Sequence, residues 1–189
     1  LPDGKLYGDN TDYYGFSYML DSAGFDVTDK KVIVLGNGGA SKKAGCVCRD
    51  KGAKEVTVIS RRSETDNYQN IAKHSDADYI INTTPVGMYP NNGESPIDLQ
   101  LFTKCLGVAD LIYNPSKTQL LLDAEKLSIP YVNGLTMLCA QAVKAAEIFT
   151  NQSFIKNKAT EITQKLEQQM LNIVLVGMPG CGISTAAKS

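Results

Sequence analysis

Three glycines, Gly36, Gly38 and Gly39, lie between an apolar run at 31–36 and a predicted helix at 40–52. Such a turn can bind the pyrophosphate of a dinucleotide, because glycine lets phosphate approach the backbone and the start of the helix offers unpaired N–H groups. The pattern departs from G-x-G-x-x-G, since Ser41 replaces the third glycine, but this small residue could itself donate to a phosphate. A plain strand-to-helix turn is the alternative; the preceding strand favours dinucleotide binding.

Two arginines follow the next predicted strand, at 55–60. An NAD site usually places Asp or Glu at the end of this strand, where it accepts a hydrogen bond from the ribose 2′-OH. Here the strand ends in Ser60, Arg61 and Arg62, and a guanidinium group suits a phosphate. We therefore predict NADP as the cofactor; the alternative is a solvated basic loop.

A run of four short polar residues, Asp9 to Asp12, precedes a predicted helix that starts near Tyr13. One of the four can cap that helix, which leaves the others open to another role. If the predicted NADP takes part in a reaction, it transfers a hydride, and hydride transfer to a carbonyl needs a proton donor as well. The only histidine, His74, lies in a polar stretch and is not expected to fill that role.

Polar groups also end the later predicted strands. Asn82, Thr83 and Thr84 close the run at 77–84, and they are placed to line a crevice because ligands bind at the carboxyl ends of parallel strands. A surface turn is an equal alternative. Tyr113 lies at the same edge and could meet a substrate or only a loop. Gln141 flanks the apolar face of a predicted helix, where a structural hydrogen bond is its usual role.

These groups must be positioned by alternating strands and helices. Strands are expected at 31–36, 55–60, 77–84, 108–114 and 130–134, and helices at 40–52, 116–127 and 135–150. This alternation predicts an α/β fold with a doubly wound parallel sheet, which is a Rossmann-like domain over residues 1–150. The buried stripe expected on the helix at 135–150 consists of Leu135, Leu138, Ala142, Ala145 and Phe149.

Residues 151–170 are polar, with apolar residues at helical spacing, and predict an amphipathic helix or linker. A strand and a second glycine turn follow at 171–189.

The composition limits the classes of partner and compartment. The net charge is −1 and apolar residues make up 43%, which gives no general attraction to nucleic acid or to an anionic membrane. Five cysteines without a framework spacing indicate reduced thiols, no metal site and a cytoplasmic protein. No apolar run is long enough to span a bilayer. The chain opens LPDGKLYGDN, without Met, and is expected to be part of a longer protein.

Five segments, in this order and spacing, closely resemble shikimate dehydrogenases. They are GDNTD (8–12), VLGNGGASKKA (34–44), INTTPVGMYP (81–90), DLIYNPSKTQLL (110–121) and NGLTMLCAQAVKAAEIF (133–149). The resemblance implies an NADP-binding domain of an enzyme that reduces 3-dehydroshikimate to shikimate in aromatic amino-acid biosynthesis. It also implies a substrate domain upstream that carries the catalytic lysine, so this chain alone is expected to bind NADP(H) and not to turn over efficiently.

The resemblance implies roles for individual residues. Asp12 matches the catalytic aspartate that binds the substrate hydroxyl, and Tyr113 and Gln141 match substrate contacts. The positions that match cofactor contacts are Gly36, Asn37, Gly38, Gly39 and Ala40 at the pyrophosphate, Ser60, Arg61 and Arg62 at the 2′-phosphate, and Thr84, Leu111 and Gly134 along the cleft to the nicotinamide. A non-catalytic NADP(H)-binding module and a relative that acts on quinate are the alternative functions.

The last segment, GMPGCGIST (177–185), resembles the P-loop of shikimate kinase. Ile183 stands where the phosphate-binding lysine is expected, and the sequence stops four residues after Thr185. We therefore expect an inert, truncated kinase start, possible in a dehydrogenase–kinase fusion.

Overall fold

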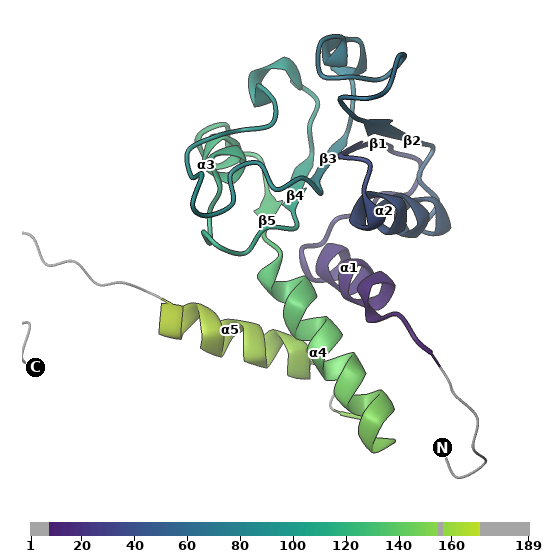
Figure 1. The fold of residues 1–189 in the computed structure, drawn as a ribbon, viewed down its shortest axis with the longest axis vertical. Helices are drawn as coiled ribbons and strands as arrows, with labels where there is room; N and C mark the ends of the chain where they lie inside the picture. Colours follow the sequence, from purple (N-terminus) through teal and green to yellow (C-terminus); the bar gives the residue numbers. More distant parts are fainter. Residues whose placement is uncertain (1–7, 155–156, 171–189) are drawn as a thin grey trace, which may run out of the picture.

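The computed structural model describes residues 8–154 and 157–170 (Figure 1). Five parallel strands form one sheet in the order β2-β1-β3-β4-β5. The strands are β1 (Lys31–Leu35), β2 (Glu55–Ile59), β3 (Tyr79–Asn82), β4 (Gly107–Asp110) and β5 (Tyr131–Val132). The helices are α1 (Thr11–Ser22), α2 (Gly39–Asp50), α3 (Gln119–Lys126), α4 (Leu135–Thr150) and α5 (Lys158–Met170), with short 3₁₀ turns η1 (Ile71–His74) and η2 (Leu99–Leu101).

Helices cover both faces of the sheet, as Figure 1 shows. Successive strand side chains point to opposite faces, so Val32 and Val34 pack with α1 and α2, whereas Ile33 and Leu35 pack with α3 and the 3₁₀ turns. The predicted doubly wound parallel sheet is therefore confirmed. Within the described residues, no helix is both long and apolar enough to cross a membrane.

The strand order places a switch point at the edge of β1. The chain runs from β1 outward to β2, then returns to the other side of β1 with β3. The connections after β1 and after β3 leave the sheet on opposite faces, which opens a crevice at the carboxyl ends of these two strands. The sites predicted at Gly36 and at Thr84 both lie at this place.

Strand β4 is shorter than predicted. The apolar run at 108–114 suggested a strand to Asn114, but the ladder ends at Asp110. The buried Asp110 carboxylate accepts a hydrogen bond from the Ile112 N–H, at 3.0 Å, and this bond turns the chain out of the sheet. The helix predicted to start at residue 116 begins at Gln119 for a similar reason, since the Thr118 hydroxyl caps it.

Helix α4 has the predicted bounds, but its predicted buried stripe is only partly right: Leu135 is buried, whereas Leu138, Ala142 and Phe149 are exposed. Its buried residues are Leu135, Cys139 and Ala140, while Leu138 and Phe149 are 41% and 88% exposed. Packing against α1 decides the orientation. A Cβ on Gly15 of α1 would lie 2.5 Å from the Gln141 Cγ, so the two helices touch closely along the polar flank of α4.

Helix α5 is the amphipathic helix expected within 151–170. It buries Ala159 and Thr163 and packs across α4 (Figure 1). The Tyr18 and Thr160 hydroxyls, 2.7 Å apart, connect it to α1.

Candidate cofactor and substrate site

The glycine turn after β1 has the geometry that a phosphate-binding turn needs. Gly36 has a φ of 107°, and a Cβ there would lie 2.8 Å from the Thr83 hydroxyl oxygen. Gly38 is the N-cap of α2 and brings no side chain to the first N–H groups. A Cβ at Gly38 or Gly39 would meet nothing within 4 Å, so the turn is open on its outer side. These features fit a pyrophosphate at the start of α2.

A cavity of about 780 Å³ joins this turn to the ends of β2 and β3. Its lining brings together many of the predicted cofactor residues, namely Gly36, Asn37, Gly38, Ser60, Arg61, Arg62 and Thr84. Tyr68, Ser95 and Pro96 line it too, and no sequence pattern would have identified them. Both arginines are exposed, and they line the same cavity as the glycine turn.

Ser41 differs from the other residues of the turn. It lies on the buried face of α2, is 1% exposed, and its hydroxyl has no hydrogen-bond partner among the described residues. This position packs the helix closely on the sheet, which is the role that the third glycine has in the usual pattern. Its contact with a phosphate stays a prediction.

The loop that carries the arginines is fixed by hydrogen bonds. The Ser60 N–H donates to the Asp66 carbonyl at 3.0 Å, and the Asp66 carboxylate lies 2.8 Å from the Lys73 ammonium and 2.9 Å from the His74 Nε2. Hydrogen bonds from Lys73, Thr65 and His74 hold the pKa of Asp66 far below its usual range. His74 thus anchors the loop through Asp66.

A buried polar network supports the crevice from below. Asn82 is fully buried and does not line the crevice itself, contrary to expectation. Its Nδ2 donates to the Asp110 Oδ1 at 3.0 Å, and its Oδ1 accepts from the Thr84 N–H and hydroxyl at 3.0 and 2.7 Å. The Asp110 carboxylate also accepts from the Thr118 hydroxyl at 2.7 Å. A carboxylate at the end of an apolar strand is a signal that could have identified Asp110.

Replacing Thr118 with Val is expected to destabilise the fold by about 1–3 kcal/mol, because one oxygen of the buried Asp110 carboxylate loses its donor and α3 loses its side-chain cap. Burial already raises the pKa of Asp110, so an unmatched charge there is unfavourable. Urea unfolding measures the change. Thr103→Val is the control, since Thr103 is exposed. Equal stability of the two variants would contradict the role of this network.

A second cavity, of about 400 Å³, lies on the other side of Thr83 and Thr84. Ala40, Leu111 and Tyr113 line it, and Tyr113 is 45% exposed. Gly134 is buried behind Leu111. A Cβ there would overlap the Leu111 carbonyl, and its N–H donates to the Ile112 carbonyl at 3.1 Å. The absence of a side chain at Gly134 therefore lets its backbone pack directly against the backbone of Leu111, beside the cavity.

Asp12 and Gln141 meet although they lie 129 residues apart. The Gln141 Nε2 donates to the Asp12 Oδ1 at 3.0 Å, and the Lys43 ammonium is paired with the other carboxylate oxygen. The helix cap is a different residue, Asn10, whose side chain accepts from the Asp12 N–H at 3.0 Å. Among the described residues, no hydrogen bond joins Tyr113 to this group. Lys43 had no sequence signal.

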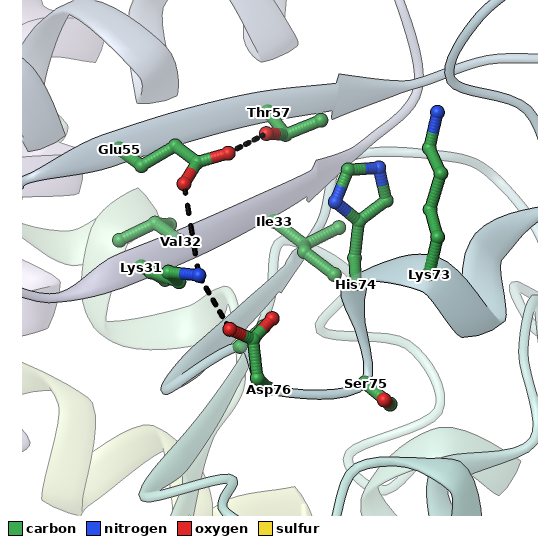
Figure 2. Close-up of a pocket in the computed structure, with 10 residues that line it drawn as sticks. Lys31, Val32, Ile33, Glu55, Thr57, Lys73, His74, Ser75 and Asp76 are labelled. Carbon is green, nitrogen blue, oxygen red and sulfur yellow. Dashed lines mark hydrogen bonds and ion pairs between the residues drawn. The ribbon is translucent and has the colours of Figure 1, made fainter.

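Another cavity, of about 230 Å³, lies near the amino ends of β1 and β2 (Figure 2). The charged groups that line this cavity are already paired. Lys31 forms ion pairs with Asp76 and Glu55, and Lys73 forms one with Asp66 in the loop that carries the arginines. It lies away from the glycine turn and the arginines. Within residues 8–154 and 157–170, no cluster of His, Cys, Asp or Glu could hold a metal ion.

Comparison with known proteins shows which dinucleotide-binding proteins this chain is similar to. No protein-family model matches the chain. It is 36% identical over 172 residues to the shikimate dehydrogenase (NADP(+)) of Clostridium beijerinckii, covering 85% of this chain and 63% of that protein. It is 43% identical to the protein of the same name from Caldicellulosiruptor bescii, covering 78% and 57%. The relatives of this chain are shikimate dehydrogenases.

Solved structures of shikimate dehydrogenases share the fold. A chorismate mutase/shikimate 5-dehydrogenase fusion protein from Clostridium acetobutylicum superposes with a TM-score of 0.80 at 36% identity, covering 85% of this chain and 62% of that one. Shikimate dehydrogenase 1 from Peptoclostridium difficile gives 0.79 at 36%, covering 88% and 64%. The chain thus spans less than two thirds of the length of these shikimate dehydrogenases. The predicted P-loop-like segment, within 171–189, lies outside the described residues.

Proposed function

We propose that this chain is the NADP-binding domain of a shikimate dehydrogenase, which reduces 3-dehydroshikimate to shikimate with NADPH. The observation that carries the proposal is one cavity at the switch point of the sheet, which is lined both by an open glycine turn and by Arg61 and Arg62. The chain with this cavity is 34–43% identical to proteins named as NADP-dependent shikimate dehydrogenases.

The residues present fit NADP along its length. The N–H groups at the start of α2 would bind the pyrophosphate, and Ser60, Arg61 and Arg62 would bind the 2′-phosphate. Thr84 and Leu111 would line the path to the nicotinamide, with Gly134 behind them. A Listeria monocytogenes relative in this fold, 29% identical, is described in complex with shikimate and NAD, so the fold alone does not select the cofactor. The arginine pair favours NADP here.

The bound NADPH would supply the hydride, and the chain would supply substrate contacts. Asp12 would accept a hydrogen bond from a substrate hydroxyl, with Gln141 beside it, and Tyr113 would contact the substrate from the neighbouring cavity. A Thermus thermophilus shikimate dehydrogenase, 26% identical with a TM-score of 0.74, is described in complex with NADP(H) and shikimate. We propose an upstream substrate domain with the proton-donating lysine as the partner of Asp12.

The proposed domain organisation is an NADP-binding domain at 1–150, a helical connector at 151–170 and a P-loop-like segment at 171–189. The proposed compartment is the cytoplasm. Neither nucleic acid nor a membrane is a proposed partner.

An activity assay on the parent protein tests the proposal. Joined to its upstream domain, the chain is expected to reduce NADP⁺ in the presence of shikimate, followed by NADPH absorbance, and the chain alone is expected to bind NADPH with little turnover. Quinate serves as the comparison substrate. If the parent protein bound NADPH but oxidised neither shikimate nor quinate, it would be a binding module and not a dehydrogenase. If it did not bind NADPH, the proposal would be overturned.

A further inference from the structure

Lys43 contacts Asp12 from the helix that begins at the glycine turn. Two donors from two helices hold the carboxylate: the Lys43 ammonium of α2 on Oδ2 and the Gln141 amide of α4 on Oδ1. Lys43 and Asp12 lie 31 residues apart, so the contact is made only by the fold.

The placement of Lys43 links it to the cofactor end of the site. It lies one turn after Gly39 and Ala40, and Ala40 lines the cavity that also contains Tyr113. The buried face of α2, which includes Ser41 and Ala44, is packed on the sheet, so the direction of the helix is fixed. The helix that would bind the pyrophosphate therefore also holds the Asp12 carboxylate.

The exposure of the pair argues against a mainly stabilising role. The side chains of Lys43 and Asp12 are 33% and 43% exposed, and ion pairs with this access to water add little to stability. Two donors on the two oxygens of one carboxylate do fix its orientation. A hydroxyl that approaches Asp12 would therefore meet an acceptor whose plane is already set, which lowers the cost of ordering the complex.

We propose that Lys43 is a positioning residue, which together with Gln141 orients the Asp12 carboxylate toward the substrate hydroxyl. The inference rests on the proposed function. It adds a lysine within this chain to the group around Asp12, distinct from the proton-donating lysine expected upstream.

Kinetics of the parent protein test the inference with three variants. Lys43→Met is expected to lower kcat/KM for shikimate at least tenfold, with Tm and the KM for NADP⁺ nearly unchanged. Lys43→Arg is expected to restore most of the loss, because a guanidinium can make the same contact. Lys51→Met is the matched control: Lys51 pairs with Asp21, 2.6 Å away, and so also joins the α2 end to α1, but far from Asp12.

The outcomes separate the possible roles. Unchanged kinetics in Lys43→Met would make the contact a surface ion pair and overturn the inference. Equal losses in Lys43→Met and Lys51→Met, together with a lower Tm and no rescue by Arg, would show a structural role and overturn it too. A wild-type parent without activity would instead contradict the proposed function.

A measurement on the chain itself does not depend on activity. The side-chain amide resonances of Gln141 report its bond to Asp12, so they are expected to shift in Lys43→Met and not in Lys51→Met. Unmoved Gln141 signals in Lys43→Met would mean that Lys43 does not orient the carboxylate.

Discussion

Replacing Asp12 with Asn in the parent protein is expected to lower kcat for shikimate oxidation by about 10²–10⁴-fold, the usual contribution of a group engaged in acid–base catalysis. Asn keeps the size of the side chain and can still accept from Gln141, but it loses the negative charge that meets Lys43 and the substrate hydroxyl. Steady-state kinetics at saturating NADP⁺ measure the loss.

The structure provides a control that separates catalysis from helix capping. Asn10 is the residue whose side chain caps α1, so Asn10→Ala is expected to cost about 1 kcal/mol of stability and to leave kcat nearly unchanged. Asp12→Asn is expected to lower kcat strongly and to leave the stability nearly unchanged. If Asp12→Asn turned over like the wild type, Asp12 would be only a residue of the first helical turn.

Replacing both Arg61 and Arg62 with Ala is expected to weaken NADPH binding and to leave NADH binding unchanged. A hydrogen bond to a charged group contributes about 1.5–3 kcal/mol, so losing even one such contact would weaken binding about 10–100-fold. Both arginines line the large cavity, and the Ser60–Asp66 contact fixes the loop on which they lie. Calorimetry of the chain with each nucleotide measures the preference.

Arg49→Ala is the matched control, because Arg49 is an exposed arginine in the last turn of α2, at the opposite end from the glycine turn. It is expected to bind NADPH like the wild type. Equal affinities of the wild-type chain for NADPH and NADH would contradict the assignment of the 2′-phosphate to these arginines. A similar loss for both nucleotides in the double variant would indicate a disturbed loop.

The elements of this fold follow from local patterns. Continuous β-branched runs marked β1 and β2, and the apolar spacing of 135–150 predicted α4 with its observed bounds. Glycines between a strand and a helix, and arginines where a carboxylate is usual, indicate the cofactor from the local sequence alone. These signals are readable because backbone preference and side-chain periodicity act over a few neighbouring residues.

Other features depended on which elements meet. The buried face of α4 differs from the predicted stripe beyond Leu135 because Gly15 lets α1 approach the polar flank of α4, and β4 ends early because the Asp110 carboxylate turns the chain. The role of Asn82 beneath the crevice followed from that same buried carboxylate.

The four polar residues around the start of α1, Asp9 to Asp12, show the division most clearly. The sequence by itself determined that a helix starts there and that one of them could cap it. Only the tertiary structure decided that Asn10 is the cap and that Asp12 meets Lys43 and Gln141. The Asp12–Lys43 contact spans 31 positions in the sequence and the Asp12–Gln141 contact spans 129. Such contacts leave no periodic pattern in a single sequence, because they depend on how whole helices pack against one sheet.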